Sequence, residues 1–161
     1  MASCLADGQL HARLLPSLSH NSLGAEGAAA LAPALAANGS LTSLDVRSND
    51  IVGDGAAKLS AAVFGNLKIG LFNEIPIKEM RANSITELDL KEKRLGVEGS
   101  MVVAGLLPVM GLLTSIDLSG NALTDYGRDM TGIMELAAAL GVNGSLTKMR
   151  YVTPKLERIW V

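Results

Sequence analysis

The sequence has few of the residues on which catalytic and metal sites most often depend. Its 161 residues include one cysteine, Cys4, and two histidines, His11 and His20. A single cysteine cannot form an intramolecular disulfide, and one thiol with two imidazoles matches no standard zinc site. We therefore expect no catalytic residues, no cofactor and no metal. The lack of disulfides also favours a reducing, cytoplasmic location.

Strong net charge and long apolar runs are missing as well. The formal net charge of -2 offers no basic face to a nucleic acid. The longest apolar run, 101–113, contains Pro108 and is too short to cross a bilayer. Residues 1–16 have no uninterrupted apolar stretch like that of a signal peptide. Neither a nucleic acid nor a membrane is expected as a partner.

Aromatic residues make up only 3% of the chain, although apolar residues make up 48%. The core must therefore be built from Leu, Ala, Val, Ile and Met. Such residues suit a stack of small, similar layers better than one large core. The length is sufficient for one domain.

Three segments share one arrangement of apolar positions, L-x-x-L-x-L-x-x-N-x-L. They are residues 41–51, 85–95 and 113–123, with Lys93 in place of the asparagine in the second. A looser copy begins at Leu67. It places Gly70, Phe72, Ile75 and Ile77 at the remaining pattern positions. Alternating apolar residues predict a short strand in each segment, and a period of 28 residues leaves room for a helix.

A helix is expected in the second half of the repeat unit, because apolar residues recur four positions apart in alanine-rich sequence. These apolar pairs are Leu31 and Leu35, Leu59 and Val63, and Val103 and Leu107. Each helix should open with an acidic residue, which suits the positive helix N-terminus, and a glycine, which suits a tight turn. These openings are Glu26-Gly27, Asp54-Gly55 and Glu98-Gly99.

The expected helix ends are Asn38-Gly39 and Asn143-Gly144, read as left-handed caps. Both asparagines also begin formal glycosylation sequons, Asn-Gly-Ser. Since the sequons recur at equivalent helix ends, the turn explains them without any sugar.

These patterns resemble the ribonuclease-inhibitor-like subfamily of leucine-rich repeat proteins. The stretches 23–35 and 143–147 are similar to repeats of NOD-like receptors and Ran GTPase-activating proteins. The resemblance implies an α/β fold, a right-handed solenoid forming a horseshoe segment, with parallel strands on the concave face and helices on the convex face. Lys93 should cost its turn one side-chain hydrogen bond.

We expect a single leucine-rich-repeat domain over residues 1–161. It would consist of an irregular N-terminal end (1–14), repeats (15–150) and a degenerate C-terminal end (151–161). The repeats would include a short degenerate unit at 67–84.

The resemblance also assigns the residues between the core positions of each strand to a concave, partner-binding face. These residues are Ser43, Asp45, Arg47, Ile69, Leu71, Glu87, Asp89, Lys91, Ser115, Asp117, Ser119, Lys148 and Arg150. Asp45, Asp89 and Asp117 share one slot in three units and predict an acidic stripe that would steer a basic protein partner. Ile69 and Leu71 would form an apolar patch, unless a one-residue shift of the strand turns them into the core.

The expected function is non-catalytic protein–protein interaction through the concave face. Three alternatives remain open: a GTPase-activating protein of the Ran-activator type, an inhibitor of a secreted enzyme that leaks into the cytosol, and a fragment of a larger intracellular receptor with no independent role. Inhibitors of this family rely on many cysteines and tryptophans, and this chain has one of each. Solenoids need polar caps, and neither 1–15 nor 151–161 resembles one. End-to-end self-association is therefore expected, and Trp160 is the candidate to cover the C-terminal end of the core.

Overall fold

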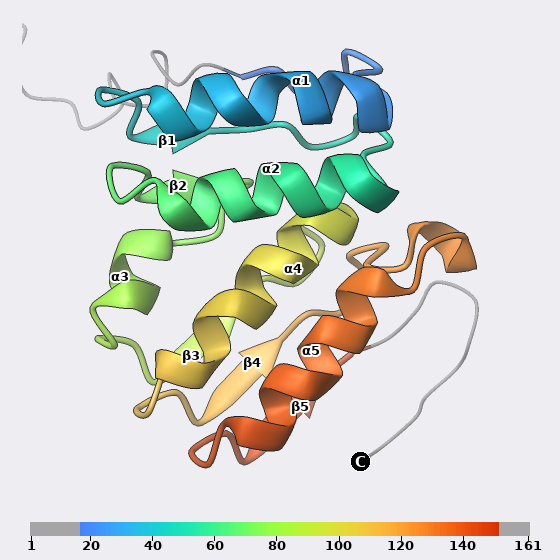
Figure 1. Cartoon of the computed structure of the whole chain (residues 1–161). Coiled ribbons are helices and arrows are strands. Elements are labelled where there is room, and N and C mark those ends of the chain that lie inside the picture. Colours follow the sequence, from blue (N-terminus) through green and yellow to red (C-terminus); the bar gives the residue numbers. More distant parts are fainter. Residues whose placement is uncertain (1–16, 152–161) are drawn as a thin grey trace, which may run out of the picture.

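The structure is a computed structural model that describes residues 17–151. The expectations for Cys4, His11, Trp160 and the two terminal ends fall outside this range. Within it, strands and helices alternate along the chain (Figure 1). The helices are α1 (Gly24–Ala37), α2 (Gly53–Gly65), α3 (Ile77–Arg81), α4 (Gly96–Leu106) and α5 (Thr131–Val142). The strands are β1 (Ser43–Leu44), β2 (Leu71–Phe72), β3 (Glu87–Asp89), β4 (Ser115–Asp117) and β5 (Lys148–Arg150).

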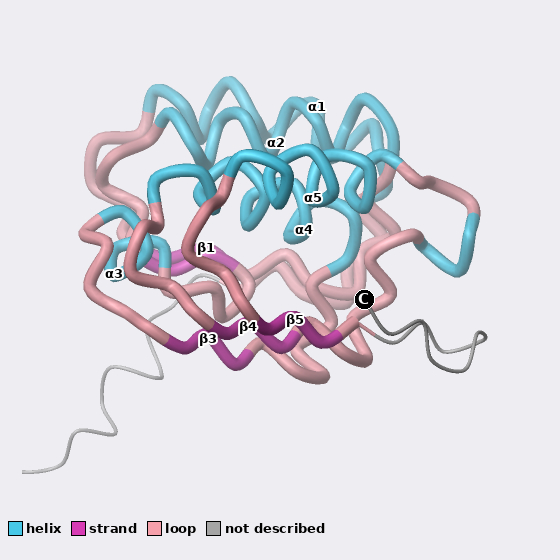
Figure 2. The backbone as a smooth tube through the Cα atoms, turned by 90° about the horizontal axis from the view of Figure 1, so that it is seen from below, coloured by secondary structure: helices cyan, strands magenta, loops and turns pink. Residues whose placement is uncertain are grey.

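The helices form one layer and the strands form the other (Figure 2). In the helical layer α1 packs on α2, α2 on α4, and α4 on α5. Short 3-10 helices follow α4, as η2 (Leu107–Val109), and precede α5, as η3 (Asp125–Gly127). All strand pairs are parallel, with β1 beside β2 and β3, β4 and β5 in sequence order. This arrangement fits the expected α/β repeat fold.

The strand layer is divided at the degenerate unit, because β2 pairs with β1 but belongs to a different sheet from β3. The pairing sets Leu44 opposite Phe72, two residues beyond the register expected from Leu67. Ile69 and Phe72 are fully buried, whereas the side chain of Leu67 is 81% exposed. The expected register was therefore wrong. The shift moves Ile69 from the expected outward position into the core and places Phe72 where Gly70 was expected. Burial of a large apolar side chain such as that of Ile69 is worth about 1.5–3 kcal/mol.

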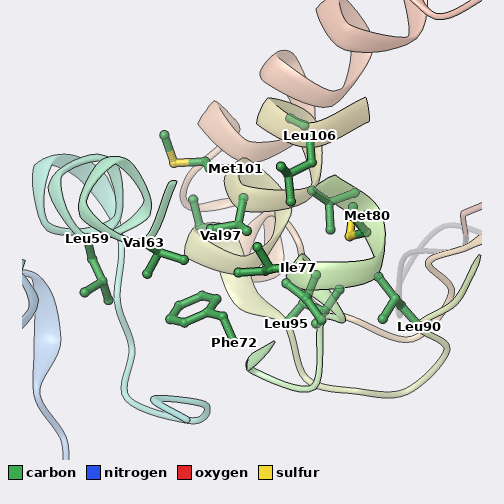
Figure 3. Close-up of a cluster of buried hydrophobic side chains, with 14 of the residues drawn as sticks. Leu59, Val63, Phe72, Ile77, Met80, Leu90, Leu95, Val97, Met101 and Leu106 are labelled. Atoms are coloured by element: carbon green, nitrogen blue, oxygen red, sulfur yellow. The ribbon is translucent and has the colours of Figure 1, made fainter. Parts of the chain in front are cut away.

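One hydrophobic core runs through all the units between the two layers. Of the expected helical stripe, Leu35, Leu59, Val63, Val103 and Leu107 are buried and Leu31 is half-buried, which confirms that prediction. Figure 3 shows Leu59 and Val63 of α2 on one side of Phe72, with Ile77 of α3 on the other side. The degenerate unit thus fills the core where the sheet is divided.

The glycines expected at the strand-to-helix turns, Gly27, Gly55 and Gly99, lie inside helices rather than in the turns. Positive φ angles occur at Gly24, Gly53 and Gly96, the first residues of α1, α2 and α4. Gly55 lies inside α2, where a Cβ atom would collide with the backbone carbonyl oxygen of Ala25 in α1. Its role is therefore to permit close helix packing, and the prediction of a turn role was wrong.

The expected left-handed caps are also absent from the two asparagine–glycine helix ends. Asn38 and Asn143 have extended φ and ψ angles. Instead, Asn38 Oδ1 accepts hydrogen bonds from the amides of Ser40 (2.9 Å) and Leu41 (2.7 Å). Asn143 forms the same turn with Ser145 and Leu146. The recurrence of Asn-Gly-Ser is thus explained by a side-chain turn, as expected, although its geometry differs.

The asparagine of the repeat pattern ties each unit to the one before it. Asn49 Nδ2 donates to the Leu18 carbonyl at 2.8 Å, and Asn121 Nδ2 donates to the Leu90 carbonyl at 2.6 Å. Within residues 17–151, Lys93 makes no equivalent side-chain bond to the backbone, as predicted. Its ammonium pairs with the Glu74 carboxylate at 2.7 Å instead.

Candidate functional site

The strand face of β3, β4 and β5 carries two rows of side chains that cross all three strands. The rows are Glu87, Ser115 and Lys148, and Asp89, Asp117 and Arg150. In β3 and β5 these residues are exposed, and in β4 they are half-buried. The structure therefore brings together six of the residues that the sequence assigned to partner binding.

The acidic stripe expected along this face is partly neutralised by basic neighbours. Arg150 Nη1 lies 3.7 Å from Asp117 Oδ2. Burial would raise the pKa of Asp117, but hydrogen bonds from Ser119 and the charge of Arg150 outweigh it and lower the pKa. Glu87 and Asp89 are the exposed acidic residues of these rows, and neither has an ion-pair partner between residues 17 and 151.

The third member of the stripe, Asp45, belongs to a separate ionic network. Arg47 holds both carboxylate oxygens of Asp45, with Nε–Oδ1 at 2.9 Å and Nη2–Oδ2 at 2.7 Å. Arg47 also pairs with Glu74, which in turn binds Lys93. The hydrogen bond from Lys93 overcomes the opposing effect of burial and lowers the pKa of Glu74. Because β2 and β3 lie in different sheets, this network links the two sheets where strand pairing stops.

The degenerate unit contributes less surface than the sequence predicted. Ile69 is fully buried in the position equivalent to Leu41, so its assignment to the partner-binding face was wrong. Leu71 is half-buried and lies beside Ser43, which is only 6% exposed. The expected apolar patch of Ile69 and Leu71 is therefore not formed.

A cavity of about 410 Å³ lies at the loop edge of the stack, away from these rows. Its lining residues come from the segments 48–52, 94–98 and 120–126, which include the first turn of α4. Glu98 is 3% exposed, and its Oε1 accepts a hydrogen bond from Asn73 Nδ2 at 3.2 Å. Burial raises the pKa of Glu98 to about 8. The sequence indicated Glu98 only as a favourable charge at a helix start.

The loop between β4 and α5 closes one side of this cavity. This unit has five more residues than the regular 28-residue period. Asp129 of the loop accepts a 2.6 Å hydrogen bond from the Gly53 amide at the start of α2, 76 residues away in sequence. Since α4 packs between α2 and α5, the loop bridges the N-terminal end of α4 (Figure 1). Asp125 and Tyr126 line the cavity from this loop.

Comparison with known families supports a leucine-rich repeat protein. The leucine-rich repeat family model matches residues 17–32, 37–60 and 112–130. These segments include most of α1, β1, most of α2, and β4 with its following loop, and they omit the degenerate unit. No curated protein matches the chain significantly. None of the helices between residues 17 and 151 has the length and apolar character needed to cross a bilayer.

Proposed function

We propose that this protein is a non-catalytic module that recognises another protein through its strand face. Leucine-rich repeats are commonly protein-interaction modules, so the repeat supports the class of function. The observation that carries the proposal is the pair of polar rows on β3, β4 and β5. Paired strands hold such side chains about 4.8 Å apart across the sheet. A surface that is already ordered avoids part of the entropy cost of binding.

The proposal includes the finer architecture expected from the resemblance. The stack is a right-handed horseshoe segment of the ribonuclease-inhibitor-like kind, its strand face is concave, and one domain spans the whole chain. The parallel strands and the separate helical layer support this geometry. A cytoplasmic location is proposed from the single cysteine, Cys4. The alternative of a Ran-type GTPase activator rests on the resemblance alone.

The charges of the strand face narrow the kind of partner. Asp45 and Asp117 already have cationic neighbours, whereas Glu87 and Asp89 are exposed on one strand. A basic partner would therefore be recognised mainly at Glu87 and Asp89. Complementary charge of this kind sets orientation and association rate more than affinity.

The test is affinity capture from a cell lysate with three baits, read by mass spectrometry. The first bait is the unmodified chain and the second carries Glu87→Lys and Asp89→Lys. The third is a matched control with Glu79→Lys and Glu135→Lys, two exposed residues of α3 and α5. We expect a partner that the first and third baits retain and the second loses at least tenfold. Partners retained equally by all three baits would contradict binding through this face.

A further inference from the structure

The carboxyl group of Glu98 has two recorded donors around it, the side chain of Asn73 and the amide of Glu98 itself. Oε1 is bound by Asn73, but Oε2 accepts no hydrogen bond from any other residue in the range 17–151. A Cβ atom added to Gly96 would lie 2.5 Å from Oε2, so this oxygen sits over Gly96, which also lines the cavity. A carboxylate can accept about four hydrogen bonds, so Glu98 keeps acceptor capacity for a ligand that enters the cavity.

The charges around the cavity favour a positively charged ligand. Asp50, Glu98 and Asp125 line it, and among the described residues of the lining Arg94 is the one basic residue. Arg94 is exposed, whereas Glu98 is buried. Burial is the main reason that the pKa of Glu98 is raised, and the negative charge of Asp125 raises it further. A cation beside Glu98 would relieve both effects, because it favours the ionised carboxylate.

The shape and lining of the cavity fit an organic cation better than a metal ion. No group of three metal-ligating side chains occurs within the described part of the chain. The volume of about 410 Å³ lies in the usual range for small-ligand sites, about 300–1,000 Å³. Ile51, Val52 and Val97 supply apolar lining beside the carboxyl group. An aliphatic stem can pack against these residues while its charged end meets Glu98.

We propose that this cavity binds a protonated primary amine carried on an aliphatic chain, with Glu98 Oε2 as the main acceptor of the ammonium group. The amine could come from a free diamine or from a lysine side chain. The loop between β4 and α5 would hold the stem, because Asp125 and Tyr126 form that side of the cavity. The site is separate from the strand face, so it does not depend on the function proposed above.

Binding should release a proton, because Glu98 must ionise to pair with the amine. The other charged or titratable groups that face the cavity are Asp50, Arg94, Asp125 and Tyr126. A primary amine of the lysine type stays protonated up to a pH of about 10. The affinity should therefore rise between pH 6 and pH 9 as Glu98 loses its proton.

The test measures binding of two amine probes by isothermal titration calorimetry. One probe is 1,5-diaminopentane and the other is Nα-acetyl-lysine methylamide, so the two arms distinguish a free diamine from a lysine side chain. Nα-acetyl-norleucine methylamide serves as the matched control without the ammonium group. We expect at least one amine to bind at least tenfold more tightly than the norleucine compound. Titrations in two buffers with different ionisation enthalpies should show proton release at pH 7.

Two isosteric variants complete the test. Glu98→Gln keeps the size and can still accept from Asn73, and it should lose at least tenfold in amine affinity together with the proton release. Glu135→Gln, on the exposed side of α5, should bind like the unmodified chain. Thermal unfolding at pH 6 shows whether Glu98→Gln remains folded. Equal affinity in a folded Glu98→Gln, equal binding of the norleucine compound, or no binding of either amine at millimolar concentration would overturn the proposal.

Discussion

At the scale of single residues, the buried side chains of Asn73 and Glu98 form the contact between units where the repeat is irregular. Elsewhere the asparagine of the repeat pattern makes that contact. Asn73 is fully buried, and its Oδ1 accepts the Val46 amide at 2.9 Å while its Nδ2 donates to Glu98. Asn49 and Asn121 could be predicted from the pattern. Asn73 could not, because the expected register of the degenerate unit was two residues away from the observed one. Its contact with Glu98 depends on packing between units.

Glu98 should make the stability of the protein depend on pH. Its pKa is about 8 in the folded chain and about 4.5 when unfolded. Between these values the folded state binds more protons, so stability is full below pH 4.5 and falls as the pH rises to 8. The loss is at most about 1.4 kcal/mol per pH unit. Chemical unfolding at pH 5, 7 and 9 should show a smaller decline for Glu98→Gln than for Glu135→Gln. Equal declines would contradict a neutral Glu98.

At the scale of elements, the ends of α1 and α2 are capped by side chains of the unit that follows each of them. Asn66 Nδ2 donates to the Leu35 and Asn38 carbonyls at the end of α1, both at 2.8 Å. The short helix α3 has no such asparagine at this place. Arg81 extends from it and donates to the carbonyls of Val63 (3.1 Å) and Phe64 (2.7 Å) at the end of α2. The long side chain of Arg81 thus reaches carbonyl groups that the short helix α3 could not otherwise cap. The spacing of apolar residues alone does not predict this contact.

The contact between α1 and α2 should make Gly55 intolerant of a side chain. An alanine inside an exposed helix usually stabilises it by about 1 kcal/mol relative to glycine. At Gly55 the added Cβ would collide with the Ala25 backbone, so Gly55→Ala should lower the free energy of unfolding by about 1–3 kcal/mol. Gly141→Ala in α5 is the control, since nothing lies within 4 Å of its Cβ position.

Denaturant unfolding, followed by circular dichroism, gives the free energy of unfolding of both glycine variants. Gly141→Ala should be stabilised or unchanged. If Gly55→Ala is as stable as Gly141→Ala, the close approach of the two helices is not what requires glycine at position 55.

At the scale of the whole molecule, the regular units could be predicted from the sequence. The degenerate unit, where the strand layer is divided, could not. The segments beginning at Leu41, Ile85 and Leu113 gave correct strands, because their apolar positions repeat without error. The unit at 67–84 was misplaced by two residues, because Leu67 matches the pattern, whereas the buried Ile69 occupies the first core position of the observed unit. The sequence did not predict the ionic network of Asp45, Arg47, Glu74 and Lys93, nor did it predict the cavity. Each brings together residues from loops whose conformation the repeat pattern does not define.

The outer side of α5, the last helix among residues 17–151, should drive self-association of the chain. Met134 and Val142 of α5 are 67% and 69% exposed, and Glu135 is the only charged residue of that helix. An internal repeat would bury such side chains against the next unit, at about 1.5–3 kcal/mol for each large one. Light scattering after size exclusion should show a mass that rises with concentration. Met134→Lys should shift the protein towards monomer, whereas Leu67→Lys, at an exposed leucine elsewhere, should not. A monomer at all concentrations, or equal effects of the two variants, would show that this helix face is not the contact between copies.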